Sequence, residues 1–445
     1  MRRYFKFWIL HYVQDRFVGF GIAIMLMVTA VQAEPMKLSL DDAIKMALKQ
    51  NPGVQMAGEK VMAARGKYVE ARSGALPKLD FTSTYTRLAP VPGVTLPPAF
   101  GGGEIKMGYA DNYDLKLSLS QSVFSWGKAQ NGYRSANAQL QATRQDSAKT
   151  RQETIASVTK AYYGVLVTQE FIRVSEEALA RVQEQERVVR KRYEAGTVSK
   201  FDLLRTQVQV ANTKPQVEKA HDGYEMTILA LKNLIGIPLD SPLELTGSLS
   251  YEPMTVDVKS ATQTAVDKRP DLKSLAYQKQ ALEHTLAIAK AGLRPNLSLA
   301  ATYDYKRPGP SGEDKWGQSA TASAILYTPL FDGFSSSGRV AQAASGVRQM
   351  EIAKKQAEEG VALEVNSAVL ALKEAQAAIE SQKENVDLAQ ESLRIGKARY
   401  DSGLITNLEI LDAELAVTQA ETNHLQALYD FQAARVNLQK AMGTL

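Results

Sequence analysis

Two short stretches, RYEAG at residues 192–196 and RYDSG at residues 399–403, decide the fold because they mark the same point in two copies of one module. The same offset of 207 residues pairs Leu204 with Leu411. From residue 123 to residue 236 the first copy aligns with the second without insertion or deletion. Self-similarity at such a distance indicates that the chain is internally duplicated.

Upstream of residue 123 the offset grows to 218 residues and pairs Pro52 with Pro270. The extra residues fall in the Pro- and Gly-rich loop 89–106, whose partner is the shorter loop 306–315. Each copy predicts a helix, a strand, a loop, a second strand, a very long helix, a glycine-containing turn and a long returning helix.

The predicted boundaries follow from this order. The first repeat covers 34–236, with an unbroken helix at 41–74, a β-hairpin at about 78–123 and a helical hairpin at about 127–236. A linker at 237–256 contains three prolines that interrupt helix. The second repeat covers 257–445, with an unbroken helix at about 258–292, a β-hairpin at about 295–330 and a helical hairpin at about 333–443.

The long helices carry a heptad pattern, which is typical of coiled-coil packing. In the second copy the stripe is Val365, Leu372, Ile379, Val386, Leu393 and Tyr400. Residues 127–194 contain no proline, so they predict a rod about 100 Å long at 1.5 Å per residue. Such a rod suits a structure that spans a compartment better than a globular domain.

The N-terminus predicts a cleaved signal peptide over residues 1–33. Basic residues precede an uncharged run from Val18 to Val31, and Ala33 ends a small-residue cleavage site. The alternative is an uncleaved anchor. Removing residues 1–33 lowers the net charge from +5 to +2, because four basic residues and one acid are lost. The basic isoelectric point is therefore partly due to the signal, and no nucleic-acid partner is expected.

The predicted strands alternate between apolar and polar residues, and their length of ten to eleven residues suits a tilted transmembrane strand. In the clearest case, Tyr113 and Leu117 share a face opposite Asp114 and Lys116. Aromatic residues at the strand ends predict contact with the membrane interface. These interface candidates are Phe124, Trp126, Trp316 and Phe331.

Four strands cannot close a barrel, and open strand edges are not tolerated in lipid. Spanning strands therefore require several chains to share one barrel. Side chains fill the interior of an eight-stranded barrel, so a duct favours three or more chains. The alternative is a small soluble sheet that packs on the helices.

The residue inventory argues against an enzyme. The chain contains no cysteine, and its four histidines are scattered without metal-ligand spacing. It has no phosphate-binding loop, no nucleophile elbow and no dinucleotide fingerprint. We therefore expect no catalytic residue, no cofactor and no metal site.

The stretch from Ala398 to Leu445, together with the doubled layout and the Tyr-x-x-Gly turns, resembles TolC-type outer-membrane efflux proteins. The resemblance covers essentially the whole mature chain. It implies a homotrimer with a shared twelve-stranded barrel in the outer membrane, four strands coming from each chain. An antiparallel coiled-coil helical tunnel would extend into the periplasm. The implied function is the outer-membrane channel of a tripartite efflux or type I secretion system, driven by an inner-membrane pump that a periplasmic adaptor connects to it.

The resemblance also implies roles for individual residues. Gly196 and Gly403 would form the periplasmic tips that contact the adaptor. Glu409 and Asp412 would place six carboxylates around the tunnel entrance in a trimer, and such a ring favours cations. The alternative is that both acids lie on an ordinary solvated helix face.

Asp202 and Tyr400 match positions in the network that closes the entrance in the family. The family's basic partner for Asp202 is replaced here by Ile405. Arg205 is the candidate substitute for that lost partner. The gating contact is therefore expected to differ from the family pattern.

Two other functions stay open at this point. One is a structural coiled-coil protein of the cell envelope. The other is a periplasmic adaptor, which would contain one helical hairpin and a biotinyl-like β domain rather than two equal copies. The cargo and the identity of the pump do not follow from the sequence.

Overall fold

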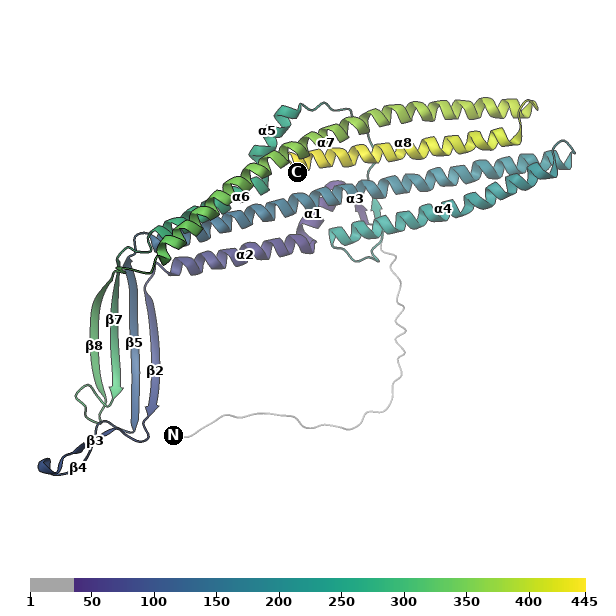
Figure 1. The fold of residues 1–445 in the computed structure, drawn as a ribbon. Helices are drawn as coiled ribbons and strands as arrows, with labels where there is room; N and C mark the ends of the chain where they lie inside the picture. The colour runs from purple at the N-terminus through teal and green to yellow at the C-terminus, as the bar shows by residue number, and fades with distance from the viewer. Residues whose placement is uncertain (1–35) are drawn as a thin grey trace, which may run out of the picture.

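The computed structural model describes residues 36–445, so the predicted signal peptide lies outside the described residues. A sheet stands at one end of a long layer of helices (Figure 1). The helices are α1 (Leu40–Gln50), α2 (Pro52–Ser73), α3 (Lys128–Glu194), α4 (Lys200–Ile235), α5 (Val258–Lys268), α6 (Pro270–Lys290), α7 (Ser335–Asp401) and α8 (Asn407–Ala441), with a 3-10 turn η1 (Pro98–Phe100). The strands are β1 (Met36–Leu38), β2 (Lys78–Arg87), β3 (Gly93–Leu96), β4 (Gly103–Lys106), β5 (Asp111–Phe124), β6 (Leu243–Leu245), β7 (Asn296–Arg307) and β8 (Gly317–Tyr327). None of the helices in residues 36–445 has both the length and the apolar character needed to cross a membrane.

The two predicted β-hairpins join in one antiparallel sheet of order β2-β5-β7-β8. The pairing of β5 with β7 connects the two copies, and it sets Leu117 opposite Tyr303 and Lys116 opposite Asp304. Because paired residues share a face, the alternation predicted for single strands continues across the sheet. Strands β2 and β8 are the two edges, and neither edge has a second partner strand within the described chain.

The helices form one layer in which α3 and α7 run the full length (Figure 1). Near the sheet the packing order is α2, α3, α6 and α7, and in the far half it is α4, α3, α8 and α7. The helical part therefore also has open edges, formed by α7 on one side and by α2 and α4 on the other. Two helical hairpins are present, α3–α4 and α7–α8, where a periplasmic adaptor would require one.

The heptad stripe of the second copy is largely confirmed. The buried members are Val365, Leu372, Ile379, Leu393 and Tyr400. Apolar residues of α8, such as Phe431 and Leu438, complete this core with members of the stripe.

The prediction of one unbroken opening helix in each copy was wrong. The first breaks between α1 and α2 at Asn51, and the second breaks between α5 and α6 at Arg269. Both residues precede a proline, which disfavours the helical conformation of the residue before it. At the first break the Asn51 side chain also caps α2, accepting a hydrogen bond of 2.8 Å from the Gly53 N–H.

Short strands form in two segments outside the repeated hairpins and helices. The loop 89–106 folds into the β3–β4 hairpin around η1. In the linker 237–256, strand β6 pairs in parallel with β1. This pairing ties the start of the described chain to the segment that joins the two repeats.

Candidate functional site

The sheet presents one polar and one apolar face. On the polar face Thr82, Lys116 and Asp304 form one row across three strands, and the Lys116 ammonium lies 3.9 Å from the Asp304 carboxylate. On the other face Phe81 and Leu117 are neighbours, with 68% and 41% of their surface exposed. The single chain therefore leaves apolar side chains uncovered that a watery environment would not favour.

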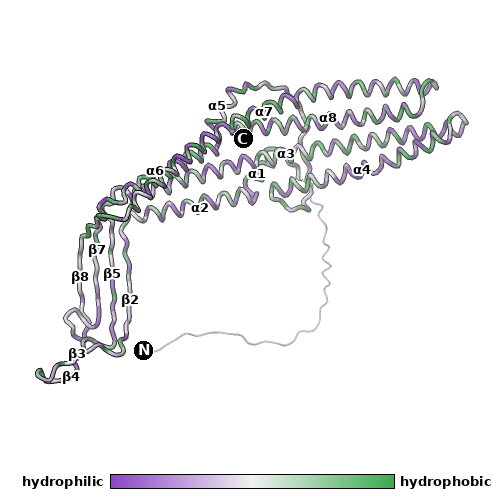
Figure 2. Tube along the Cα trace, viewed as in Figure 1, coloured by the Kyte–Doolittle hydropathy of each residue, from purple (hydrophilic) through white to green (hydrophobic). Residues whose placement is uncertain are grey.

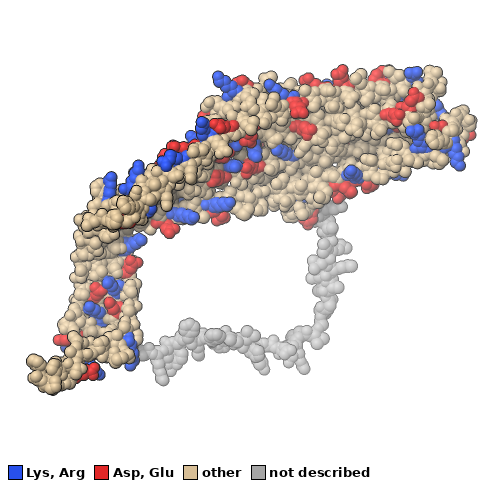
Figure 3. All heavy atoms as spheres, viewed as in Figure 1, with Lys and Arg blue, Asp and Glu red and all other residues tan. Residues whose placement is uncertain are grey.

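Hydropathy and charge vary over short distances along the molecule. Hydrophilic and hydrophobic residues alternate along both strands and helices in Figure 2. Acidic and basic side chains are intermixed along the helices on the face seen in Figure 3. That face has no continuous basic surface of the kind that binds nucleic acid.

The four aromatic interface candidates lie at opposite ends of the sheet. Trp316, at the end remote from the helices, stacks on Tyr305 with ring centres 4.9 Å apart. At the helical end Phe124 contacts Trp126 at 5.0 Å, and Phe331 has its own aromatic partner in Phe334. All four candidates are at least 42% exposed. Sequence reasoning missed Tyr305, although its place at the end of an alternating strand was a usable signal.

Each sheet-to-helix junction uses two successive residues with left-handed backbone. The φ values are 51° at Trp126 and 78° at Gly127, and 63° at Gly333 and 66° at Phe334. An aromatic residue in this region is uncommon and strained. The Arg294 guanidinium lies over the Trp126 ring at 4.7 Å and helps to hold that side chain in place.

The predicted tip turns lie at the end of the helical layer farthest from the sheet (Figure 1). Gly196 and Gly403 have φ values of 76° and 72°, which glycine adopts without steric cost. In both turns the residue after the glycine donates its N–H to a carbonyl five residues back, at Arg192 and Arg399 respectively. The repeated sequence thus produces the same helix ending twice.

The first turn of each returning helix is closed by a capping box. The Ser199 N–H and hydroxyl donate to the Asp202 carboxylate, and the Thr406 N–H and hydroxyl donate to Glu409. In return, each hydroxyl accepts the backbone N–H of the acid. Asp202 and Glu409 are therefore equivalent residues of the two repeats. The pattern Ser/Thr-x-x-Asp/Glu was visible in the sequence and was missed.

Tyr400 contacts Arg192, a residue outside the predicted network. Tyr400 is only 5% exposed, and the Arg192 guanidinium lies 4.3 Å from its ring centre. Arg192 also donates to the Tyr400 carbonyl and the Asp401 carboxylate, each at 3.0 Å. Burial raises the pKa of Tyr400, with Asp202 adding to the shift and Arg192 opposing it. Arg192 was not identified from the sequence.

Arg205, the candidate substitute, is exposed, and its side chain makes no hydrogen bond or ion pair with any residue in 36–445. A role for it in gating stays a prediction. Glu409 and Asp412 are also exposed, one turn apart on α8. Hydrogen bonds from Thr406 lower the pKa of Glu409, which therefore stays ionised. Their arrangement as a ring stays a prediction as well.

A buried polar chain connects the two helical hairpins near the tips. The Gln185 amide donates to the Asn407 side-chain oxygen at 2.8 Å, and the Asn407 amide donates to the Thr206 hydroxyl at 2.9 Å. All three side chains are at most 6% exposed. No group of three or more His, Asp or Glu side chains within residues 36–445 is arranged to hold a metal ion.

Comparison with known proteins finds relatives that match most of this chain. The chain is 25% identical over 435 residues to the alkaline protease secretion protein AprF of Pseudomonas aeruginosa, covering 96% of this chain and 88% of AprF. It is 22% identical over 415 residues to the pyoverdine export outer membrane protein OpmQ of Pseudomonas putida, covering 91% and 85% of the two chains.

The fold is that of a solved outer-membrane channel. The CmeC channel of Campylobacter jejuni superposes with a TM-score of 0.80 at 19% identity, covering 91% of this chain and 85% of CmeC. The sequence profile described as "Outer membrane efflux protein" matches two stretches of the chain, residues 43–237 and 261–444. The duplicated chain therefore belongs to the outer membrane efflux protein family, whose members are passive outer-membrane channels and not enzymes.

Proposed function

We propose that three copies of this chain form a channel whose twelve-stranded barrel crosses the outer membrane and continues into a periplasmic helical tunnel. The observation that carries this proposal is the four-stranded sheet with one apolar face and two open edges. Open edges in lipid leave backbone groups without hydrogen bonds. Because the sheet has an even number of antiparallel strands, β8 of one copy can pair antiparallel with β2 of the next.

The helical edges support the same assembly. On α7 a row of exposed apolar residues lies on one side of the helix, because their spacings of 11, 7, 18 and 7 residues are close to whole helical turns. These residues are Ile352, Leu363, Leu370, Leu388 and Ile395. The opposite edge, α4, exposes Phe201, Leu204 and Val208 at helical spacing. Copies that join edge to edge would bury both apolar rows.

The channel provides a passive duct, and the energy comes from partner proteins. A periplasmic adaptor would contact the turns at Gly196 and Gly403, and an inner-membrane pump would drive export. The relatives are named for secretion of an alkaline protease and for export of pyoverdine. By analogy, the cargo of this chain is either a secreted protein or a small molecule.

The assembly can be tested with a lipid-face substitution and a matched control. Leu117→Arg places a charge on the apolar face in every copy and should abolish outer-membrane trimers, since such a charge costs about 2–4 kcal/mol at the bilayer midplane. The adjacent Ser118→Arg lies on the polar face and should leave assembly intact. The readout is the native mass of the detergent-extracted complex. A soluble monomer or dimer from the wild-type chain would contradict the proposal.

The acidic entrance is tested separately. Glu409→Gln combined with Asp412→Asn should reduce the cation selectivity of single channels in planar bilayers. Gln at position 409 can still close the capping box, so the charge changes while the helix cap remains. Unchanged selectivity would mean that these acids are a solvated helix face.

A further inference from the structure

The segments within two helical turns of the sheet carry an excess of positive charge. At that end of the helical layer (Figure 1) the segments are residues 67–77, 125–134, 284–295 and 328–341. They contain seven basic residues and two acids, Glu70 and Asp332, which gives a net charge of +5. The basic residues, here called the basic collar, are Lys67, Arg72, Lys128, Arg134, Lys290, Arg294 and Arg339. Residues 34–445 together carry only +2, so the remainder is net negative.

The basic collar is accessible and almost without acidic partners. Six of its members are exposed, and Lys128 is half-buried. Within residues 36–445 only Arg339 of the collar has an ion pair, with the Asp332 carboxylate at 3.6 Å. Like charges at close range repel one another, so anions from outside the chain would stabilise this end of the helical layer.

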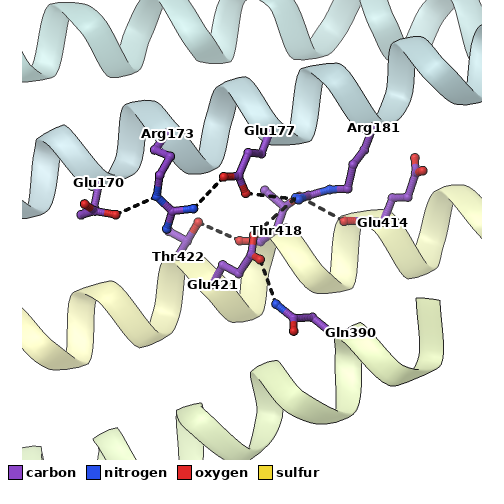
Figure 4. A network of polar contacts seen from close by, with 9 residues as sticks. All are labelled: Glu170, Arg173, Glu177, Arg181, Gln390, Glu414, Thr418, Glu421 and Thr422. Carbon is purple, nitrogen blue, oxygen red and sulfur yellow. Dashed lines mark hydrogen bonds and ion pairs between the residues drawn. The ribbon is translucent and has the colours of Figure 1, made fainter. Parts of the chain in front are cut away.

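Arginines in the far half of the helical layer have a different environment (Figure 4). Arg173 donates to the Glu177 carboxylate at 2.7 Å, and Arg181 donates to the Glu421 carboxylate at 3.4 Å. Glu414, which is 3% exposed, belongs to the same network of side chains. Acids of the chain itself therefore neutralise these arginines, whereas the basic collar lacks such acids.

The charges at the other end of the sheet are balanced as well. The segments 87–111 and 306–316 contain five basic residues and four acids. Three ion pairs form there, at 3.9, 2.8 and 3.4 Å. They are Arg87–Asp111, Arg307–Asp314 and Lys315–Glu313. The unpaired positive charge is thus a property of the helical end of the sheet.

The basic collar begins where the apolar face of the sheet ends. Leu297 is on the same face of β7 as Tyr303, and Phe124 lies opposite Leu297. The Phe124 ring contacts Trp126 at 5.0 Å, and the Arg294 guanidinium lies 4.7 Å from the centre of the Trp126 ring. An unbroken row of side chains therefore leads from the apolar face to the guanidinium of Arg294.

We propose that the basic collar binds the phosphate groups of anionic phospholipids in the leaflet nearest the helices. This inference rests on the proposed membrane-spanning barrel. Headgroups lie where the apolar face gives way to aromatic and basic residues, and long basic side chains can reach them while their stems cover apolar surface. The guanidinium of Arg294 can donate two hydrogen bonds to one phosphate. Lys290, one helical turn earlier, and Lys128, two residues after Trp126, add positive charge nearby.

The test uses the full chain reconstituted in vesicles, with its own tryptophans as reporters. Trp126 reports on the collar, Trp316 reports on the other end of the sheet, and Trp8→Phe in every variant removes the third tryptophan. Trp316→Phe then leaves Trp126 as the single reporter, and Trp126→Phe leaves Trp316. Phosphatidylcholine with brominated acyl chains quenches a tryptophan at the lipid surface. An unbrominated lipid restores the fluorescence wherever it displaces the brominated one.

At Trp126, phosphatidylglycerol should displace the brominated lipid about fivefold better than phosphatidylcholine does, the factor expected from one basic residue near an anionic surface. The preference should weaken as salt is added, because salt screens exposed charges. At Trp316 the two unbrominated lipids should be equally effective, since the charges there are paired.

Matched variants assign the preference to the collar. Lys290→Gln combined with Arg294→Gln should bring the ratio at Trp126 to about one. Lys106→Gln combined with Lys315→Gln removes the same charge from exposed positions at the other end of the sheet and should leave the ratio unchanged. Arg294→Lys keeps the charge and should retain the preference, which separates attraction of the headgroup from stacking on Trp126.

The outcomes distinguish this inference from the barrel on which it rests. Equal displacement by the two lipids at Trp126, or a preference that persists in the Lys290→Gln, Arg294→Gln variant, would overturn the inference and leave the barrel standing. Quenching of Trp316 but not of Trp126 would also overturn it, because the collar would then lie away from lipid. If the brominated lipid quenched neither tryptophan, the proposed barrel itself would be wrong. The native mass of each variant shows whether the complex has assembled.

Discussion

The two helix turns share a sequence but not an environment. Tyr400, in the second turn, is 5% exposed, whereas its equivalent Tyr193 is 38% exposed. Arg192 contacts Tyr400 and Asp401, whereas its equivalent Arg399 makes no side-chain hydrogen bond or ion pair within residues 36–445. The difference arises because α3 has a helix on both sides in the chain, while α7 has an open side. A duplicated sequence therefore does not produce duplicated contacts in one chain.

A neighbouring copy would restore the symmetry. The contact of α3 with α8 joins the two hairpins within the chain. In the proposed assembly its equivalent would be a contact of α7 with α4 of the next copy. In that arrangement Arg399 would face Tyr193 and Glu194 of the neighbour, as Arg192 faces Tyr400 and Asp401. The exposed turn residues are then those whose partners lie in another chain.

The largest expected effect is the difference in stability between alanine substitutions of the two equivalent tyrosines. Tyr400→Ala removes a buried ring and should destabilise the tip by about 3 kcal/mol, whereas Tyr193→Ala should leave the packing inside one chain nearly unchanged. Hydrogen exchange of the single chain, before it assembles, measures this as lost amide protection at the ends of α7 and α8. Equal losses for the two variants would show that the two turns have the same environment.

Substituting Arg192 should destabilise the single chain more than substituting Arg399 does. The effect should be smaller than that of Tyr400→Ala. Arg192→Leu removes two charge-assisted hydrogen bonds and should cost about 1–3 kcal/mol within the chain. Arg399→Leu should act only on the assembly, because the partners proposed for Arg399 lie in the neighbouring copy. The temperature at which the complex dissociates on semi-native gels reports the second effect.

Exchanging the charges of Arg399 and Glu194 tests whether these two residues contact each other between copies. Arg399→Glu alone and Glu194→Arg alone should each lower the dissociation temperature, and the double variant should recover it. Failure of the double variant to recover would remove the proposed contact between copies.

The caps should behave alike, since both turns contain the same capping box. Ser199→Ala and Thr406→Ala should each cost about 1 kcal/mol and fray the first turn of α4 or α8. Hydrogen exchange of those first turns is the measurement. A large difference between the two variants would mean that contacts beyond the cap hold one of the turns.

Lowering the pH should have the smallest effect. The pKa of Glu409 is depressed in the folded protein by hydrogen bonds from Thr406, so its stabilisation is present above the unfolded pKa of about 4.3. That stabilisation is lost as the pH falls through the lower folded pKa. The chain has no cysteine, so the Leu404→Cys variant can be labelled with a dye at that one position. The attached dye should become more mobile only at acidic pH. Glu409→Gln should flatten this pH dependence.

Much of the local structure was predictable from short-range patterns. Strand alternation identified Leu117 and Lys116 as residues of opposite faces, and the glycine turns fell at Gly196 and Gly403. The helix break at Asn51 was equally readable from the proline that follows it, and it was overlooked. These features depend on residues within a few positions of one another, where dihedral preferences and periodicity decide.

The candidate site was less predictable for a physical reason. Arg205 is close to Asp202 in the sequence, whereas Arg192 reaches Tyr400 from a position 208 residues away. Nothing in the pattern around Glu414 distinguishes it from the solvated acids of the same helix. Its burial depends on which helices pack over that side of α8.

The sequence by itself determined the duplication, the faces of the strands and the ends of the helices. The tertiary structure alone decided that the hairpins of both copies join through β5 and β7, and that Tyr400 is buried while Tyr193 is exposed. Equivalent residues have the same local preferences, but each contact needs a second surface. In one chain of a repeated structure, only the inner surfaces have that neighbour.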